Sequence, residues 1–590
     1  MDDISDRFPM EPPDPEWEAA NPGWPDVPPE DPRWHPGKKN DHGNLSAKAN
    51  IMNGADPHAP NASASERGNK SNTMPTIRVV AGERHLAADA GLAAMVGAEV
   101  DFYQRDRSLV RTALAKAKSA GGSTVEVPGI VPVTIPMLGR ALGESAIWEK
   151  LVKSGEDENG NPQFKSIRID PPKEVVEQIA AMNGMWQFRP LSGVISTPTM
   201  RPDGSLLLAP GYDDATGLVL MCAPPVPAIS DSPTRADADG AMNLLKGLFR
   251  EFPFADEASR SVALSMALTT VLRGALLPAV PFHVATAPQP GTGKSYLLDI
   301  PAAITTGERC GVIAHSADPA EFEKRLVGAA LAGQAIIAID NVSRELGGDF
   351  LNQVTERPLL QMRPLGGSTM IRVPNTFTVF ANGNNLSAPA DLVRRTLVAR
   401  LDADMENPET RVFSQNPLQM ILANRGAYIA ACLTIGRAYI CAGSPDPCPP
   451  LASFEPWSNL VRSALVWLGC ADPCLSMELA RTEDPTRAAR TAFFTAWRDE
   501  IGLRGARSVA QLVQEAETTG PNGFLCPNLR EACLTVAEDR TGNLISPKRL
   551  GKWLSLNKNN RVGDLKLVAD NQTAARVYWR LDRVYTLTPP

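Results

Sequence analysis

The stretch 281-PFHVATAPQPGTGKSYLLDI-300 decides the fold class of this chain. An apolar run typical of a buried strand, residues 281–287, is followed by a glycine turn and then by a pattern typical of a helix. The turn matches the phosphate-loop pattern GxxxxGK[ST], except that Pro288 stands where the first glycine is expected. Gly291 and Gly293 let successive backbone N–H groups point at one anion, and a helix beginning at Lys294 directs its positive end there. The stretch therefore predicts a site for the phosphates of a nucleotide.

Seven consecutive residues form the predicted site for ATP. Lys294 is expected to reach the β and γ phosphates, and Ser295 is expected to bind Mg²⁺. A chance GTGKS turn is the alternative. The predicted nucleotide-binding residues are Pro290, Gly291, Thr292, Gly293, Lys294, Ser295 and Tyr296.

A second apolar strand, 335-AIIAID-340, ends in a carboxylate that is placed to hold Mg²⁺ through water. The alternative role for Asp340 is simply to begin a turn. The next residue, Asn341, cannot accept a proton from an attacking water molecule. Either Glu345 or Glu356 supplies that base, or hydrolysis is slow.

A third element, 376-TFTVFANGNNLSAPADLVRRTLVARLD-402, contains a strand that ends in asparagines and a helix that ends in two arginines. Asn384 is the candidate for orienting water against the γ-phosphate, with Asn382 and Asn385 beside it. Arg394 or Arg395, which the sequence does not separate, is the candidate for an arginine that reaches the nucleotide of a neighbouring subunit. A positively charged helix C-terminus is the alternative explanation of the pair.

In this order and spacing, PGTGKS, AIDNV, ANGNNL and VRRTLVARLDADMENPETRVF resemble the motifs of an AAA+ ATPase. More narrowly, residues 339–368 and 453–473 resemble helicase-type ATPases that phages, plasmids and integrative elements encode beside or within primases. The segments DPPKEVV and GYDDATGLVL resemble the part that precedes the ATPase in those proteins. The likeness covers roughly residues 76–590, and Pro288 and Asn341 depart from the pattern.

The resemblance implies an α/β fold: a three-layer αβα P-loop core with a helical lid, a preceding mixed α/β domain and a C-terminal winged helix. The expected parts are a disordered, Pro-rich acidic tail (1–75), the mixed α/β domain (76–240), the ATPase core (241–415), the lid (416–500) and the winged-helix domain (501–590). Within 76–240, Asp213 and Asp214 are expected to be turn residues.

The C-terminal residues predict a DNA-binding surface. Residues 1–35 carry ten acidic side chains and two arginines, whereas residues 540–590 carry ten basic and three acidic side chains. A helix opened by Ser546 and Pro547 is expected to present its cations to DNA phosphates. A solvated basic face on a protein-docking winged helix is the alternative. The predicted DNA-binding residues are Lys548, Arg549, Lys552, Lys558 and Arg561.

Composition excludes several other classes of protein. The 590 residues are 43% hydrophobic and 21% charged, and no apolar run reaches the roughly 18 residues of a membrane span. The nine cysteines form no CxxC pair and there are only six histidines, so neither a disulfide framework nor a zinc site is expected. The acidic N-terminus lacks the features of a secretion signal, so the expected location is cytoplasmic, without membrane attachment.

The predicted function is that of an ATP-dependent DNA helicase or translocase for replication of a mobile element, acting as a homo-oligomeric, hexameric ring alongside a primase or other replication protein. The segment 363–373, with Arg363 and Arg372, is either a DNA-contacting loop or a structural insertion. The alternative function is an origin-binding or helicase-loading factor that ATP switches without unwinding, which Asn341 favours. A third is an ATPase adaptor that binds protein partners through the winged helix.

Overall fold

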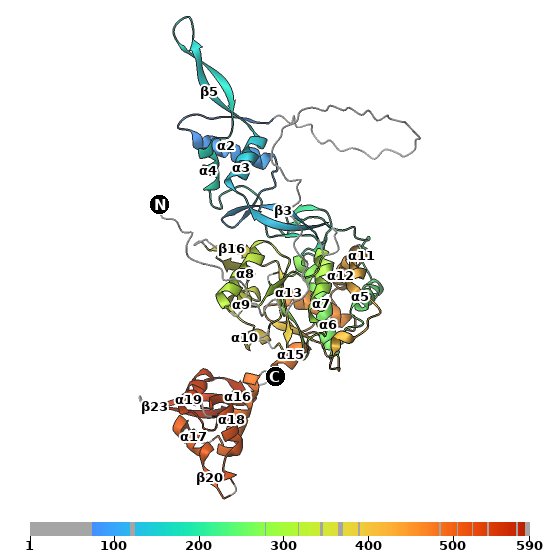
Figure 1. Ribbon diagram of the computed structural model, residues 1–590, viewed down its shortest axis with the longest axis vertical. Coiled ribbons are helices and arrows are strands. Elements are labelled where there is room, and N and C mark those ends of the chain that lie inside the picture. The colour runs from blue at the N-terminus through green and yellow to red at the C-terminus, as the bar shows by residue number, and fades with distance from the viewer. Residues whose placement is uncertain are drawn as a thin grey trace, which may run out of the picture. The chain divides into compact units, whose positions relative to one another are not determined.

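The computed structural model describes most of the chain from Met74 onward (Figure 1). The predicted tail lies outside the described residues except for Met74 and Pro75, and Glu345 lies outside them as well. The described ranges are 74–118, 124–277, 279–316, 318–342, 346–363, 370–386, 390–482, 485–503, 505–521, 523–539, 542–573 and 576–584.

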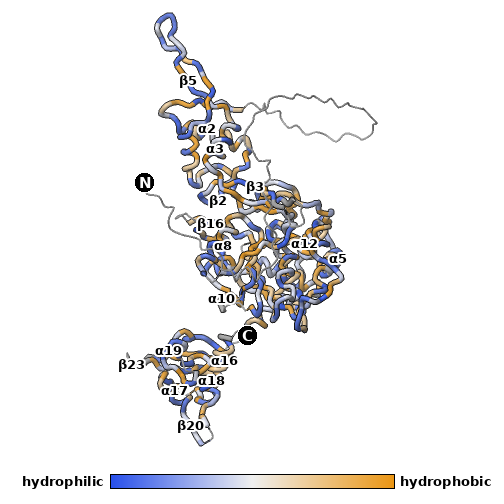
Figure 2. The backbone as a smooth tube through the Cα atoms, in the orientation of Figure 1, coloured by the Kyte–Doolittle hydropathy of each residue, from blue (hydrophilic) through white to orange (hydrophobic). Residues whose placement is uncertain are grey.

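Residues 76–220 form helices and small sheets. The helices α2, α3 and α4 enclose a core that includes Leu142, Trp148 and Val175. The long β5–β6 hairpin ends in hydrophilic residues (Figure 2). The elements are β1 (Thr76–Arg78), α2 (Arg84–Gly97), β2 (Tyr103–Arg105), β3 (Ser108–Lys118), β4 (Thr124–Pro132), α3 (Ile135–Ser145), β5 (Ile147–Glu156), β6 (Pro162–Ile169), α4 (Lys173–Ala180), β7 (Gly193–Ile195), β8 (Thr199–Met200), β9 (Leu206–Leu207), β10 (Gly211–Asp213) and β11 (Leu218–Leu220).

Two antiparallel pairs, β8–β9 and β10–β11, form short hairpins in this part of the chain. Asp213 accepts hydrogen bonds from the backbone N–H of Thr216 (3.1 Å) and its hydroxyl (2.7 Å), and it pairs with Arg201 at 2.8 Å. These contacts fix the turn, so Asp213 has the structural role that the sequence predicts.

A five-stranded parallel sheet forms the centre of the next part of the chain. The strands are β12 (Phe282–Ala287), β13 (Val312–Ala314), β14 (Ile336–Asp340), β17 (Thr378–Asn384) and β18 (Thr396–Arg400). Their order is β13-β14-β17-β12-β18, and every pairing is parallel. All carboxyl ends therefore meet at one edge of the sheet. Because β17 lies between β12 and β14, the phosphate-loop strand and the Asp340 strand are roughly 10 Å apart.

Both faces of this sheet are buried, which explains the near-continuous apolar runs of its strands. Ile336 and Ala338 of β14 share a hydrophobic cluster with α7, whereas Ile337 and Ile339 share another with α8. The predicted α/β class with a parallel sheet is confirmed. The surrounding elements are α5 (Arg235–Leu248), α6 (Glu257–Val271), η1 (Arg273–Ala275), α7 (Lys294–Thr306), α8 (Pro319–Leu331), α9 (Asp349–Val354), β15 (Leu359–Met362), β16 (Ile371–Pro374) and α10 (Ala390–Val393).

The helices that follow β18 continue the core on the α7 side of the sheet. Helix α12 packs on α5 and α6, and the indole N–H of Trp457 donates to Thr269 Oγ1 at 2.8 Å. Among the described residues, only α11 and α12 taken together, across a 92° bend, have the length and composition of a membrane span, and no single helix does. The elements are η2 (Pro408–Thr410), α11 (Pro417–Ala423), α12 (Arg425–Cys441), α13 (Glu455–Trp457), η3 (Ser458–Arg462), α14 (Ser463–Trp467) and α15 (Leu475–Thr482).

The C-terminal part has its own core and begins earlier than the sequence suggests. Phe493, Phe494 and Trp497, which fall within the predicted lid, pack with Leu550 and Leu554 of α19. An antiparallel sheet of order β19-β24-β23-β22 flanks these helices. The elements are α16 (Pro485–Ala496), η4 (Trp497–Ile501), β19 (Arg507–Ser508), α17 (Val509–Glu517), β20 (Thr519–Gly520), β21 (Gly523–Phe524), α18 (Pro527–Ala537), α19 (Pro547–Leu556), β22 (Arg561–Val562), β23 (Leu565–Thr573) and β24 (Arg576–Arg583).

Candidate nucleotide-binding site

The loop between β12 and α7 has the backbone of an anion cradle. Gly291 and Gly293 have φ angles of 78° and 95°, which lie in the left-handed region that glycine adopts without strain. Gly293 is the N-cap residue of α7, a helix of 13 residues. The N–H groups of its first turn, which have no partner within the helix, therefore lie next to the loop. The loop therefore combines turned backbone amides with the positive end of a helix, both of which favour an anion.

Lys294 folds back over this loop. Its Nζ donates to the carbonyl oxygen of Gln289 at 2.9 Å and to Thr292 Oγ1 at 3.4 Å. Both acceptors are neutral, and burial lowers the pKa of the Lys294 ammonium because its charged form loses hydration. A phosphate in the loop offers this cation the charged partner that it lacks here.

Three side chains from three elements meet beside the loop. Ser295 Oγ donates to Asp340 Oδ1 at 3.3 Å, and Asn382 Nδ2 donates to the same carboxylate oxygen at 2.7 Å. Asn382 Nδ2 also lies 3.4 Å from Ser295 Oγ, and its Oδ1 accepts from the backbone N–H of Asn341 at 3.2 Å. The arrangement links the start of α7 to the carboxyl ends of β14 and β17.

The donor set at this point fits Mg²⁺. A hydroxyl and one carboxylate are hard oxygen ligands, and Mg²⁺ is commonly held by one or two carboxylates together with substrate phosphates and water. Within the described residues, no group of three or more His, Cys, Asp or Glu side chains is arranged to hold a metal. Ser295 and Asp340 would therefore hold Mg²⁺ only in company with a bound phosphate.

The asparagine in contact with Asp340 is Asn382 and not Asn384. Asn382 is buried and lies level with Ala285, whereas Asn384 lies two residues further along β17, exposed, and level with Ala287. The predicted role of Asn384 in orienting water remains a prediction. The contact of Asn382 was missed because the sequence does not fix which strand lies next to which, although the two-residue spacing places both side chains on one face.

Of the two candidates for the base that Asn341 cannot supply, Glu345 lies outside the described residues and Glu356 is described. Asn341 is exposed, with φ at 52°. Glu356 forms an ion pair with Arg395, which precedes β18 and so lies at the amino edge of the sheet, opposite the loop. Glu356 therefore cannot activate water at the loop of its own chain in this conformation.

The two arginines, inseparable in sequence, have different surroundings. The Arg395 side chain is 9% exposed and held by Glu356, whereas Arg394 is exposed. Both precede the amino end of β18, which is five residues long and pairs with β12. A strand of this length separates them from the loop edge by about 16 Å. Arg394 is thus exposed and too far away to serve the loop of its own chain.

Replacing Arg395 by alanine is expected to destabilise the chain by about 1–3 kcal/mol without abolishing nucleotide binding. The substitution leaves Glu356 without its cation and opens a cavity at a buried position. Thermal unfolding of the full-length chain measures the effect, and Arg394→Ala is the matched control, for which no shift is expected. Equal melting of the two variants would show that the ion pair contributes nothing.

The segment 363–373 belongs to an antiparallel hairpin, β15–β16, whose residues 364–369 lie outside the described set. Asp106 accepts from the Arg372 backbone N–H at 3.0 Å and from its guanidinium at 3.4 Å. Arg372 therefore contacts Asp106, between β2 and β3, and this contact favours a structural insertion over a DNA-contacting loop for that residue.

The predicted DNA-binding cations are exposed. Leu550 and Leu554 anchor α19 in the C-terminal core, so Lys548 and Lys552 project on the outer face one turn apart. Arg549 instead donates to the carbonyl oxygen of Glu538, which commits its guanidinium to the fold. Lys558 and Arg561 follow the helix and are also exposed.

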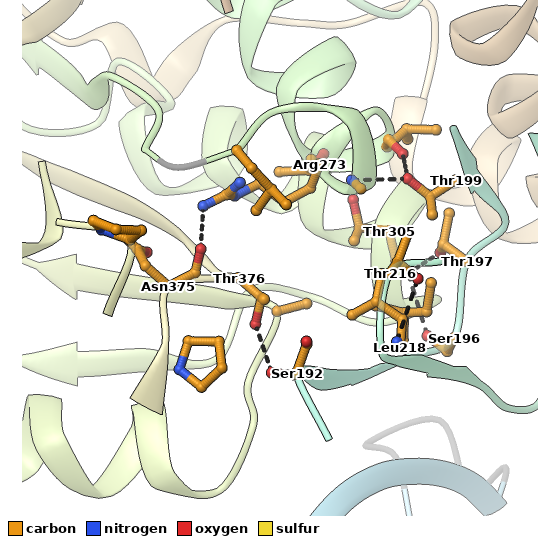
Figure 3. Close-up of a pocket in the computed structure, with 18 of the residues that line it drawn as sticks. Ser192, Ser196, Thr197, Thr199, Thr216, Leu218, Arg273, Thr305, Asn375 and Thr376 are labelled. Atoms are coloured by element: carbon orange, nitrogen blue, oxygen red, sulfur yellow. Dashed lines mark hydrogen bonds between the residues drawn. The ribbon is translucent and has the colours of Figure 1, made fainter. Parts of the chain in front are cut away.

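A separate cavity of about 300 Å³ lies at the amino edge of the parallel sheet (Figure 3). Arg273 borders it and is held by the carbonyl oxygens of Asn375 (2.6 Å) and Phe377 (3.3 Å). Burial lowers the pKa of Arg273 to about 10. Because the residues before β12, β14 and β17 line this cavity, it is distinct from the loop at the opposite edge.

Comparison with known proteins gives only distant likenesses. No protein-family model and no curated protein matches the chain. Among solved structures, 255 chains match. Two are A-form apo structures of the NrS-1 C-terminal region, with TM-scores of 0.35 and 0.33 and identities of 13% and 12%; they cover 76% and 75% of this chain and 99% and 98% of those chains. A third is SCCmec type IV Cch, described as an active helicase, with a TM-score of 0.31 and 11% identity, covering 82% of this chain and 97% of that one. Similarities of this size do not carry an activity from those proteins to this chain.

Proposed function

We propose that this chain is a Mg²⁺-dependent ATPase of the AAA+ type that uses ATP to unwind DNA, or to move along it, during replication of a mobile element. One observation carries the ATPase part: Ser295 Oγ lies 3.3 Å from Asp340 Oδ1, beside a glycine loop that opens α7. The hydroxyl and the carboxylate come from opposite sides of β17, and their meeting requires the observed strand order. This is the geometry that a metal–triphosphate site needs.

Each residue of the site has a definite task in this proposal. The loop amides and Lys294 bind the phosphate oxygens and offset their charge. Ser295 and Asp340 hold Mg²⁺, which neutralises charge that develops on the phosphates during hydrolysis. Asn382, through its 2.7 Å hydrogen bond, fixes the orientation of the Asp340 carboxylate.

Assembly into a ring completes the site. Arg394 is exposed at the sheet edge opposite the loop, so it can stabilise a γ-phosphate only in a neighbouring copy. A head-to-tail contact between identical chains brings one chain's loop edge to the next chain's Arg394 edge, and such contacts form a ring when the rotation between neighbouring chains closes. A homo-oligomeric ring, with six subunits as the expected number, is the assembly that this proposal favours.

Asn341 supports a second candidate function, in which ATP acts as an assembly switch for an origin-binding or helicase-loading factor. A residue that cannot accept a proton stands beside Asp340, and Glu356 is held elsewhere. ATP hydrolysis measured with and without single-stranded DNA, together with strand displacement on a forked duplex, separates the candidates. DNA-stimulated turnover with displacement supports the motor; ATP-dependent DNA binding without displacement supports the switch.

The double variant Lys548→Ala/Lys552→Ala is expected to weaken binding to double-stranded DNA and to reduce the salt dependence. Loss of two phosphate contacts lowers the slope of log affinity against log salt by about 2. Fluorescence anisotropy at several salt concentrations measures both quantities. Lys173→Ala/Lys324→Ala removes the same charge elsewhere and is the control. If both double variants bind DNA like the wild type, Lys548 and Lys552 do not contact DNA phosphates, which favours the adaptor alternative.

A further inference from the structure

Residues 402–416, here called the strap, connect β18 to α11 and cross the phosphate loop. The strap touches the loop at Gly291: a Cβ on that residue would lie 2.8 Å from Glu409 Oε2 and 3.2 Å from Glu409 N. No larger residue fits there without moving the strap. The path of the strap is thus tied to the backbone that would cradle phosphate.

Hydrogen bonds hold the second half of the strap, from Arg411 to Asn416. Tyr296, in the first turn of α7, donates from its hydroxyl to Asn416 Oδ1 at 2.9 Å. The Glu251 carboxylate accepts from the backbone N–H groups of Ser414 (3.1 Å) and Gln415 (3.3 Å), and Arg411 donates to the Glu251 carbonyl at 2.7 Å. The strap is therefore a fixed element beside the loop.

Two large apolar residues between these anchors face solvent. Val412 is 96% exposed and Phe413 is 54% exposed. The Arg411 guanidinium lies over the Phe413 ring, 5.1 Å from its centroid. Phe252 and Tyr296 stack nearby, with centroids 6.0 Å apart, and Phe252 lies 3.8 Å from where a Cβ on Gly293 would be. The Phe252–Tyr296 pair thus lies beside the loop, and Phe413 lies four residues after Glu409, the strap residue that touches Gly291.

The strand order tells which end of a nucleotide would meet the strap. Asp340, and with it the γ-phosphate end, lies on the β14 side of the loop strand. The strap leaves β18, which flanks β12 on the other side. A triphosphate that runs along the loop toward Asp340 therefore directs its nucleoside end toward the strap.

We propose that the strap binds the base of the nucleotide, with the ring of Phe413 stacking on a purine beside the Arg411 guanidinium. The proposal rests on the proposed ATPase function and adds the base-binding residue. An aromatic ring can stack on any base because every base has a π face. Phe413 should therefore increase the affinity for both ATP and GTP. A neighbouring subunit is the other occupant that this exposed ring could meet.

Isothermal titration of the full-length chain with Mg²⁺·ATP and with Mg²⁺·tripolyphosphate tests the proposal. Phe413→Ala should weaken ATP binding about tenfold and leave tripolyphosphate binding unchanged, because only ATP carries a base. Phe413→Trp should retain ATP affinity within about twofold. Met405→Ala, which removes another exposed apolar side chain of the strap, is the control and should bind both ligands like the wild type.

Other outcomes overturn the proposal. Equal weakening of both ligands in Phe413→Ala would mean that the strap only shapes the loop. Unchanged ATP affinity in Phe413→Ala would mean that the base binds elsewhere. If sedimentation then showed a smaller assembly for this variant, the Phe413 side chain would contact a second copy of the chain. If the wild-type chain binds tripolyphosphate and ATP with equal affinity, base binding is refuted and the phosphate site stands. If it binds neither ligand, the proposed ATPase function itself is refuted.

Discussion

The variant Lys294→Ala is expected to hydrolyse ATP about 10²–10³-fold more slowly than the wild type while keeping its fold. Loss of a preorganised cation at a developing phosphate charge accounts for a reduction of this size. The fold should persist because Lys294 Nζ bonds only within its own loop, to Gln289 and Thr292. Steady-state release of phosphate, with circular dichroism as a check of folding, makes the comparison.

Lys324→Ala is the matched control for this substitution. Lys324 is an exposed lysine of α8 whose partner, Glu321, lies 3.8 Å away on the same helix. Its removal changes the net charge equally and should leave turnover at the wild-type level. Normal ATP hydrolysis by Lys294→Ala would mean that this loop does not bind the phosphates of ATP.

The variant Arg394→Ala is expected to lose about 10³-fold in turnover, in the range known for arginines that reach a phosphate from another subunit. The decisive test mixes Arg394→Ala chains with Lys294→Ala chains in equal amounts. In a head-to-tail ring, about a quarter of the interfaces then combine an intact Lys294 with an intact Arg394. Turnover of the mixture should rise well above that of either variant alone.

Arg395→Ala provides the control for the mixing experiment. Because Arg395 is held by Glu356 within its own chain, this variant should hydrolyse ATP nearly normally when it is folded, and mixing should add nothing. A mixture of Arg394→Ala and Lys294→Ala that shows only the sum of its parts would mean that each site is complete within one chain.

The local parts of the site could be predicted from sequence. A glycine turn between a strand and a helix fixes the positions of Lys294 and Ser295 through backbone geometry alone, and Asp340 follows from its place at the end of an apolar strand. The alternation of strands and helices likewise predicts a parallel sheet, because parallel strands need helical connections. These features depend on residues close together in the chain.

Features that depend on distant partners could not be predicted. Asn382 contacts Asp340 only because β17 lies between β14 and β12, an order that composition does not reveal. Arg395 differs from Arg394 only through Glu356, about forty residues earlier. From sequence alone, the aromatic residues of α16 fit a helical lid as well as they fit the C-terminal part. Only their packing against α19 assigns them to the C-terminal core. In each case a long-range contact decides between equal local patterns.

Equilibrium dialysis of ATP against the full-length chain, with and without Mg²⁺, tests the central claim most directly. The proposed site predicts one ATP bound per chain in the presence of Mg²⁺, weaker binding by Asp340→Asn and little binding by Lys294→Ala. A wild-type chain that retains no ATP in the presence of Mg²⁺ would contradict the account, whatever the affinity of its C-terminal cations for DNA.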